Sequence, residues 1–117
     1  MSEIRVTTIS ATNGTGPVTL TKQSAAKAWL DYNQSGPSID GSYNISSVTD
    51  SAAGLFTFTL SSAMASANWS STVGSASYVM QFSGSLTSTQ GPMRTRDATG
   101  SNSDATQNCI AAHGDLA

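Results

Sequence analysis

Residues Leu55–Leu60 read LFTFTL, the most regular alternation in the chain. Apolar side chains at every second position are typical of a β-strand with one buried face, so Phe56, Phe58 and Leu60 are predicted to point into a core. The preceding segment, Asp50–Gly54 (DSAAG), has the composition of a turn. We therefore expect a β-strand at Leu55–Leu60 that is entered through a turn.

Shorter stretches of the same character lie on both sides of this strand, at spacings of roughly 10 to 15 residues. The expected strands are Ile4–Ile9, Val18–Leu20, Ala25–Tyr32, Tyr43–Val48, a strand starting near Asn68–Ser70, Tyr78–Phe82 and Gln107–His113. Asn13–Pro17 is predicted to be a turn and Thr95–Thr106 a long exposed loop. This pattern predicts an all-β fold, a small antiparallel β-sandwich of the jelly-roll-like kind. Residues 1–24 are expected to form an extended N-terminal arm or hairpin, and residues 25–117 the head domain.

Composition and charge exclude several classes of protein. The 117 residues fit one domain, only 10% of them are charged, and the net charge is -2. Five Lys and Arg cannot form an extended basic surface, so we expect no nucleic-acid binding. No run of about 18 apolar residues is available to cross a membrane, and residues 1–5 do not resemble the start of a signal peptide. The lone cysteine cannot form an internal disulfide.

The composition also predicts a thin core. Hydrophobic residues make up 38% of the chain, but roughly a third of them are Ala, which buries little area. Ser and Thr together reach about 31% of the chain, far above ordinary globular usage. With so few large side chains, the free energy gained by burying them only narrowly offsets the entropic cost of ordering the backbone. We therefore expect a partner surface, most simply in an oligomer of this chain.

No combination of residues predicts catalysis, a metal site or a cofactor. His113 is the only histidine and lies near the end of the chain, and no Gly-x-Ser-x-Gly motif accompanies the many serines. Cys109 lies four residues from His113, about 13 Å along a strand, and is interpreted as a small buried hydrophobe. Asp97 and Asp104 flank a polar loop without the spacing of a calcium-binding loop. The chain is therefore not expected to be an enzyme.

The aromatic residues allow two interpretations. In a domain with a thin core, large aromatic side chains serve most often as anchors of the core or of an interface. The residues assigned to this role are Trp29, Phe56, Phe58 and Trp69. The alternative is a sugar-stacking platform built from both tryptophans and the three tyrosines, Tyr32, Tyr43 and Tyr78.

Four segments resemble a known family when they are taken in order. They are Lys27–Asn33 (KAWLDYN), Asp40–Asp50 (DGSYNISSVTD), Gly54–Leu60 (GLFTFTL) and the pairs Ala63–Met64 and Asn68–Trp69. The order resembles small phage tail-fibre-like proteins that are common in phages and prophages of aquatic bacteria. The resemblance is most specific over residues 27–69, whereas residues 70–110 share only β character.

The resemblance implies a bacteriophage virion structural protein, a tail-fibre or spike subunit of the adsorption apparatus. It implies an all-β homotrimer without catalytic activity or cofactor, made in the host cytoplasm and located in the virion. The N-terminal arm would contact other virion proteins. The residues expected to face a host surface glycan are Arg96, Asp97, Asn102 and Asp104, which belong to the Thr95–Thr106 loop. The alternatives are a monomeric carbohydrate-binding module and a capsid decoration protein.

Overall fold

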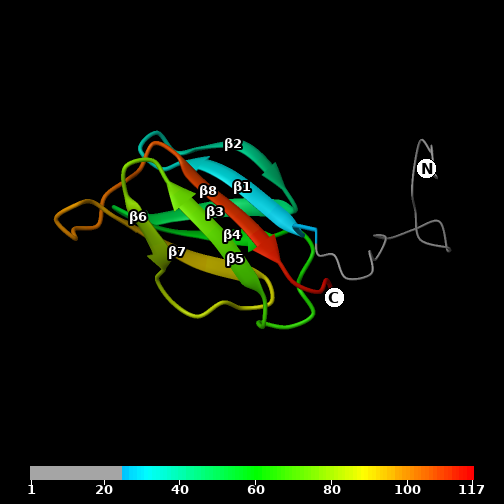
Figure 1. Cartoon of the computed structure of the whole chain (residues 1–117). Coiled ribbons are helices and arrows are strands. Elements are labelled where there is room, and N and C mark those ends of the chain that lie inside the picture. The colour runs from blue at the N-terminus through cyan, green and yellow to red at the C-terminus, as the bar shows by residue number, and fades with distance from the viewer. Residues whose placement is uncertain (1–24) are drawn as a thin grey trace, which may run out of the picture.

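The computed structural model describes residues 25–117, and this part of the chain contains eight strands and no helix (Figure 1). In chain order the strands are β1 (Ala28–Asn33), β2 (Ser38–Tyr43), β3 (Ile45–Ala52), β4 (Leu55–Leu60), β5 (Ser70–Ser75), β6 (Val79–Phe82), β7 (Gln90–Arg96) and β8 (Asn108–His113). Since the described residues hold no helix of any length, they offer no long apolar helix that could cross a membrane. The strands expected at Ile4–Ile9 and Val18–Leu20, and the arm they would form, lie outside the described residues.

The strands form two four-stranded antiparallel sheets, with orders β2-β1-β8-β5 and β3-β4-β7-β6. The sheets lie one behind the other in Figure 1, so the all-β sandwich expected from the sequence is present. Three pairs of consecutive strands, β1–β2, β3–β4 and β6–β7, stay within one sheet. The other four connections cross between the sheets, and the jelly-roll-like winding expected from the sequence stays a prediction.

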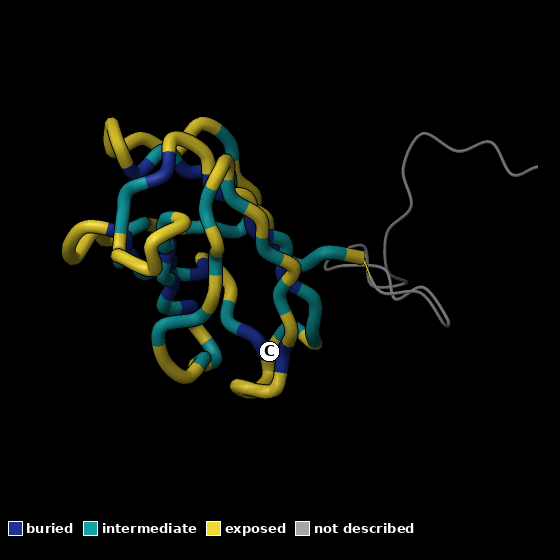
Figure 2. Tube along the Cα trace, turned by 60° about the vertical axis from the view of Figure 1, so that its left-hand side comes forward, coloured by how far each residue is buried: buried dark blue, intermediate teal, exposed yellow. Residues whose placement is uncertain are grey.

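The core lies between the two sheets and follows the two-residue period of the strands. On β4, Phe56, Phe58 and Leu60 are buried while the intervening residues are half-buried, which confirms the alternation predicted for LFTFTL. Figure 2 shows the same alternation of buried and exposed stretches along the strands, with the connecting loops exposed. The other large buried hydrophobic side chains are those of Leu30, Tyr32, Met64, Trp69, Met93 and Ile110.

One expected strand is divided in the structure. The prediction placed a single strand at Tyr43–Val48, but Asn44 has a positive φ of 56° and separates β2 from β3. Asn tolerates this conformation better than most residues, and its side chain fixes the corner. The Nδ2 group donates to the carbonyl oxygens of Lys27 and Ser62, and Oδ1 accepts from the Ser62 N–H at 2.6 Å. The chain therefore leaves one sheet at β2 and enters the other at β3.

Strand β7 was not predicted, and it shortens the expected Thr95–Thr106 loop. Thr95 and Arg96 are the last residues of β7, so the loop begins at Asp97. The strand contains Gly91 and Pro92, which obscure its alternation, although Gly91, Met93 and Thr95 are all buried. Strand β3 likewise continues to Ala52, into the segment predicted to be a turn.

Candidate functional site

The outer face of the β2-β1-β8-β5 sheet carries two exposed aromatic side chains. Trp29 on β1 and Tyr43 on β2 are directly opposite in the antiparallel register, so both project from the same face of the sheet. Ala28, Leu30 and Tyr32 alternate with Trp29 and are buried, which directs Trp29 outward. Trp29 is 45% exposed and Tyr43 is 59% exposed. We call Trp29 and Tyr43 the aromatic pair.

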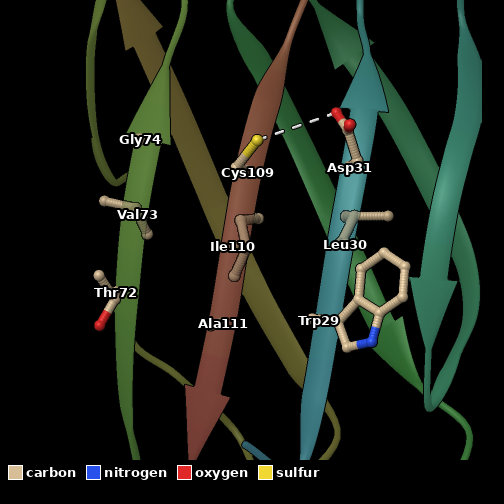
Figure 3. Close-up of a pocket in the computed structure, with 9 residues that line it drawn as sticks. All are labelled: Trp29, Leu30, Asp31, Thr72, Val73, Gly74, Cys109, Ile110 and Ala111. Carbon is tan, nitrogen blue, oxygen red and sulfur yellow. Dashed lines mark hydrogen bonds between the residues drawn. The ribbon is translucent and has the colours of Figure 1, made fainter.

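Small side chains beside Trp29 leave a hollow of about 490 Å³ in this face (Figure 3). Trp29 lies opposite Ala111 of β8, and Ala111 lies opposite Thr72 of β5. One step along the strands, Asp31, Cys109 and Gly74 form a second row. A Cβ atom on Gly74 would meet no heavy atom within 4 Å, which shows how open this end of the hollow is.

The indole ring of Trp29 lies against strand β2. A Cβ atom added to Gly41 would lie 3.0 Å from both Cη2 and Cζ3 of Trp29, so the ring rests where only a glycine leaves room. Figure 3 shows the ring face-on, inclined toward β2 and away from the hollow's far side. The face of the indole is therefore presented at the surface of the sheet.

Asp31 supplies the polar group of this face. Its Oδ2 accepts a hydrogen bond from Gln107 Nε2 at 3.1 Å, and its Oδ1 lies 3.9 Å from Cys109 Sγ (dashed line in Figure 3). Desolvation raises the pKa of the Cys109 thiol, and the nearby Asp31 charge and hydrogen bond raise it further. Cys109 is thus a neutral thiol at neutral pH, and among the described residues Asp31 is the one carboxylate that borders the hollow.

The interpretation of Cys109 as a buried hydrophobe is wrong, because Cys109 is exposed. On β8 the buried side chains are Asn108, Ile110 and Ala112, and the intervening positions face outward. Cys109 and His113 share this outer face at opposite ends of the strand. Within residues 25–117 no group of three or more His, Cys, Asp or Glu side chains is placed to hold a metal ion.

The four predicted anchors do not share one environment. Phe56, Phe58 and Trp69 are buried in the core, and the rings of Phe58 and Trp69 meet edge to face with centroids 6.1 Å apart. Trp69 also donates from Nε1 to the carbonyl oxygen of Thr87 at 2.8 Å. Trp29 is not part of the core. Its role as an anchor of an interface, the other part of the prediction, stays a hypothesis.

The four residues expected to face a host surface glycan also differ in their surroundings. Asn102 is exposed and bridges to Arg96 at the base of the loop. Asp97 uses its carboxylate to hold the loop, accepting hydrogen bonds from the Thr99 hydroxyl at 2.6 Å and from two backbone N–H groups. These hydrogen bonds, led by that of Thr99, lower the pKa of Asp97. Asp104 accepts a hydrogen bond from the Gly54 N–H at 2.7 Å, so it secures the loop to the β3–β4 turn.

Two arginines lie on the opposite face of the sandwich: Arg96, which was expected to face a host, and Arg94, which was not among the predicted site residues. Arg94 and Arg96 both project outward from β7, and they lie opposite Gln81 and Val79 of the edge strand β6. Their Nε atoms are buried and have no hydrogen-bond partner among the described residues. Arg94 and Arg96 are two residues apart, a spacing that places both side chains on one face of a strand. Pro92 in the same segment argues against a strand, so this spacing was not used to predict one.

Comparison with known proteins found no match, whether to a family model, to a curated protein or to a solved structure.

Proposed function

We propose that this chain is a structural subunit of a bacteriophage virion, a tail-fibre or spike protein that assembles as a homotrimer. Support comes from the resemblance of residues 27–69, which covers β1 to β4 and the segment leading to β5. A compact two-sheet sandwich rich in Ser and Thr suits a subunit that is exposed on a particle and carries little charge. The proposal includes contact with other virion proteins through the N-terminal arm, and it includes no catalytic activity.

The observation that carries the proposal is the contrast between a small core and large exposed hydrophobic side chains. Of the buried hydrophobic residues, Ala28, Ala105 and Ala112 contribute little area. Meanwhile Ile39 is 44% exposed and Val79 is 63% exposed, in addition to the aromatic pair. Interfaces between copies of one chain are richer in apolar area than the rest of the surface, so self-association would bury the side chains that the monomer leaves exposed.

The exposed aliphatic residues lie on opposite edges of the sandwich. Ile39 belongs to edge strand β2, and Val79 belongs to edge strand β6. Beside Ile39 is Asp40, and beside Val79 is Arg96. A β2 edge of one copy therefore complements a β6 edge of the next in both apolar character and charge. A contact between two different edges is heterologous, and such contacts form a ring when the rotation from copy to copy closes and a filament when it does not.

Charge reversal at these edges tests the proposal. Asp40→Arg and Arg96→Asp each place like charges across the contact, so each variant is expected to sediment at lower mass than the wild-type chain. The double variant restores opposite charges and is expected to recover the wild-type mass. Ser85→Glu, in an exposed loop, is the control. Wild-type mass in both single variants, with native circular dichroism spectra, would refute this contact.

A second candidate, a monomeric carbohydrate-binding module, is favoured by one observation. The aromatic pair is exposed on a sheet face beside a hollow, whereas an anchor of the core would be buried. Solution mass separates the two candidates, because a binding module acting alone would sediment as a monomer of 12.0 kDa.

A further inference from the structure

We infer that the outer face of the β2-β1-β8-β5 sheet, at Trp29, Tyr43 and Asp31, is a binding site for a pyranose ring of a neutral glycan. This inference goes beyond the proposed function, and it places on a sheet face the host contact that was expected at the Thr95–Thr106 loop. It does not require the trimer, since every residue that carries it belongs to one copy of the chain.

The aromatic pair provides a stacking surface that is already in place. Because Trp29 and Tyr43 are register partners, their Cβ atoms lie about 4.5–5.5 Å apart on one face. The indole is held against Gly41, so little conformational freedom is lost when a ligand covers it. The face of an aromatic ring carries negative partial charge and attracts the carbon-bound hydrogens of a sugar ring. A pyranose therefore finds an ordered partner at Trp29.

Asp31 adds the hydrogen-bonding group that a sugar needs. An ionised carboxylate has about four acceptor positions, and the contacts from Gln107 and Cys109 leave some of them open. Sugar hydroxyls donate well to a carboxylate, and hydrogen bonds to a charged acceptor are stronger than neutral ones. Thr72 borders the same hollow on its far side. The combination of a flat aromatic ring and a nearby carboxylate fits a polyhydroxylated ring better than a purely apolar ligand.

The charge of the hollow limits the kind of sugar. Within residues 25–117, Asp31 is the only charged side chain at its border, because the pKa of Cys109 is raised and none of the three described cations, Lys27, Arg94 and Arg96, lines it. A sialic or uronic acid would place its carboxylate near that of Asp31 without a compensating cation. The site therefore favours neutral hexoses and N-acetylhexosamines. Its volume of about 490 Å³ falls within the range of sites that hold small ligands.

The test is binding of the full chain to a printed array of neutral and sialylated oligosaccharides, followed by calorimetric titration with the neutral oligosaccharide that gives the strongest signal. Trp29→Ala is expected to lower affinity at least about tenfold, as removal of a central aromatic contact does. Asp31→Asn should also weaken binding, while preserving the side-chain shape. Ser85→Ala, in an exposed loop outside the site and outside the proposed subunit contact, is the control and should bind as the wild type does.

The solution mass of each variant is measured alongside binding. Loss of glycan binding in Trp29→Ala at unchanged mass and circular dichroism spectrum supports the inference. Absence of any neutral glycan that binds the wild type at millimolar concentration overturns it, as does binding that Trp29→Ala leaves unchanged. A wild-type trimer without glycan binding would reject this site and keep the fibre subunit, whereas a monomer that binds glycan would do the reverse.

Discussion

Replacing Gly91 by Ala should destabilise the fold through a collision in the core. Gly91 lies opposite Phe58 on the neighbouring strand, and an added Cβ would lie within 2.5 Å of Phe58 Cε1 and closer still to Cζ. Phe58 has no solvent-exposed surface, and its ring already packs against Trp69. The ring therefore cannot move aside without disturbing the core.

The expected size of the effect follows from two opposing contributions. Overpacking a core costs about 1–3 kcal/mol, and the Gly→Ala change itself returns about 0.5–1 kcal/mol in backbone entropy. We expect the free energy of unfolding to fall by about 1 kcal/mol. At a urea m-value of about 1–2 kcal/mol per molar, the unfolding midpoint should fall by about 0.5–1 M.

The assay is urea unfolding followed by tryptophan fluorescence and far-ultraviolet circular dichroism, at one protein concentration because association alters apparent stability. Gly74→Ala is the matched control. Its added Cβ would meet open space, so this variant should gain about 0.5 kcal/mol. A Gly91→Ala variant as stable as the wild type, or more stable, would refute the assignment of this close contact.

Three further predictions concern other parts of the molecule. Trp69→Ala should lower the free energy of unfolding by about 3–5 kcal/mol in thermal or urea unfolding, and intact assembly with selective loss of glycan binding would contradict its structural role. Cys109 should react with iodoacetamide at pH 7 more slowly than free cysteine, because partial desolvation and the Asp31 charge raise its pKa although the residue is exposed. Asp31→Asn should accelerate that reaction, and a wild-type rate equal to that of free cysteine would disprove the shift. The hydrogen bond from Thr99 depresses the pKa of Asp97, so the stabilisation is present above its ordinary value near 3.8 and is lost as pH falls through the depressed pKa. An NMR titration in which Asp97 protonates at or above its ordinary value would contradict this.

The alternation of apolar residues was enough to predict parts of this fold. Phe56 and Phe58 were placed on the buried face of their strand because each strand position alternates between the two faces. The same period places Trp29 opposite Ala28 and Leu30, and therefore outside the core. Composition alone had predicted Trp29 to be an anchor of the core or of an interface, and the local alternation excludes the core.

Other elements could not be predicted because their reasons lie elsewhere in the chain. Gly91 and Pro92 suggest a break in β7, and only the ring of Phe58 on the next strand explains why a glycine is needed there. Strand β2 (SIDGSY) lacks alternation because it is an edge strand that is exposed along nearly its whole length. The hollow beside Trp29 is formed by three strands that are distant in sequence, so no local sequence motif predicts it.

The most direct test of the central claim is the absolute mass of the full chain in solution, measured by light scattering behind a sizing column. A homotrimeric fibre or spike subunit predicts a mass near three times 12.0 kDa, with the missing burial located between subunits. A single species of 12.0 kDa at all concentrations tested would contradict the trimer and make the monomeric carbohydrate-binding module the leading account.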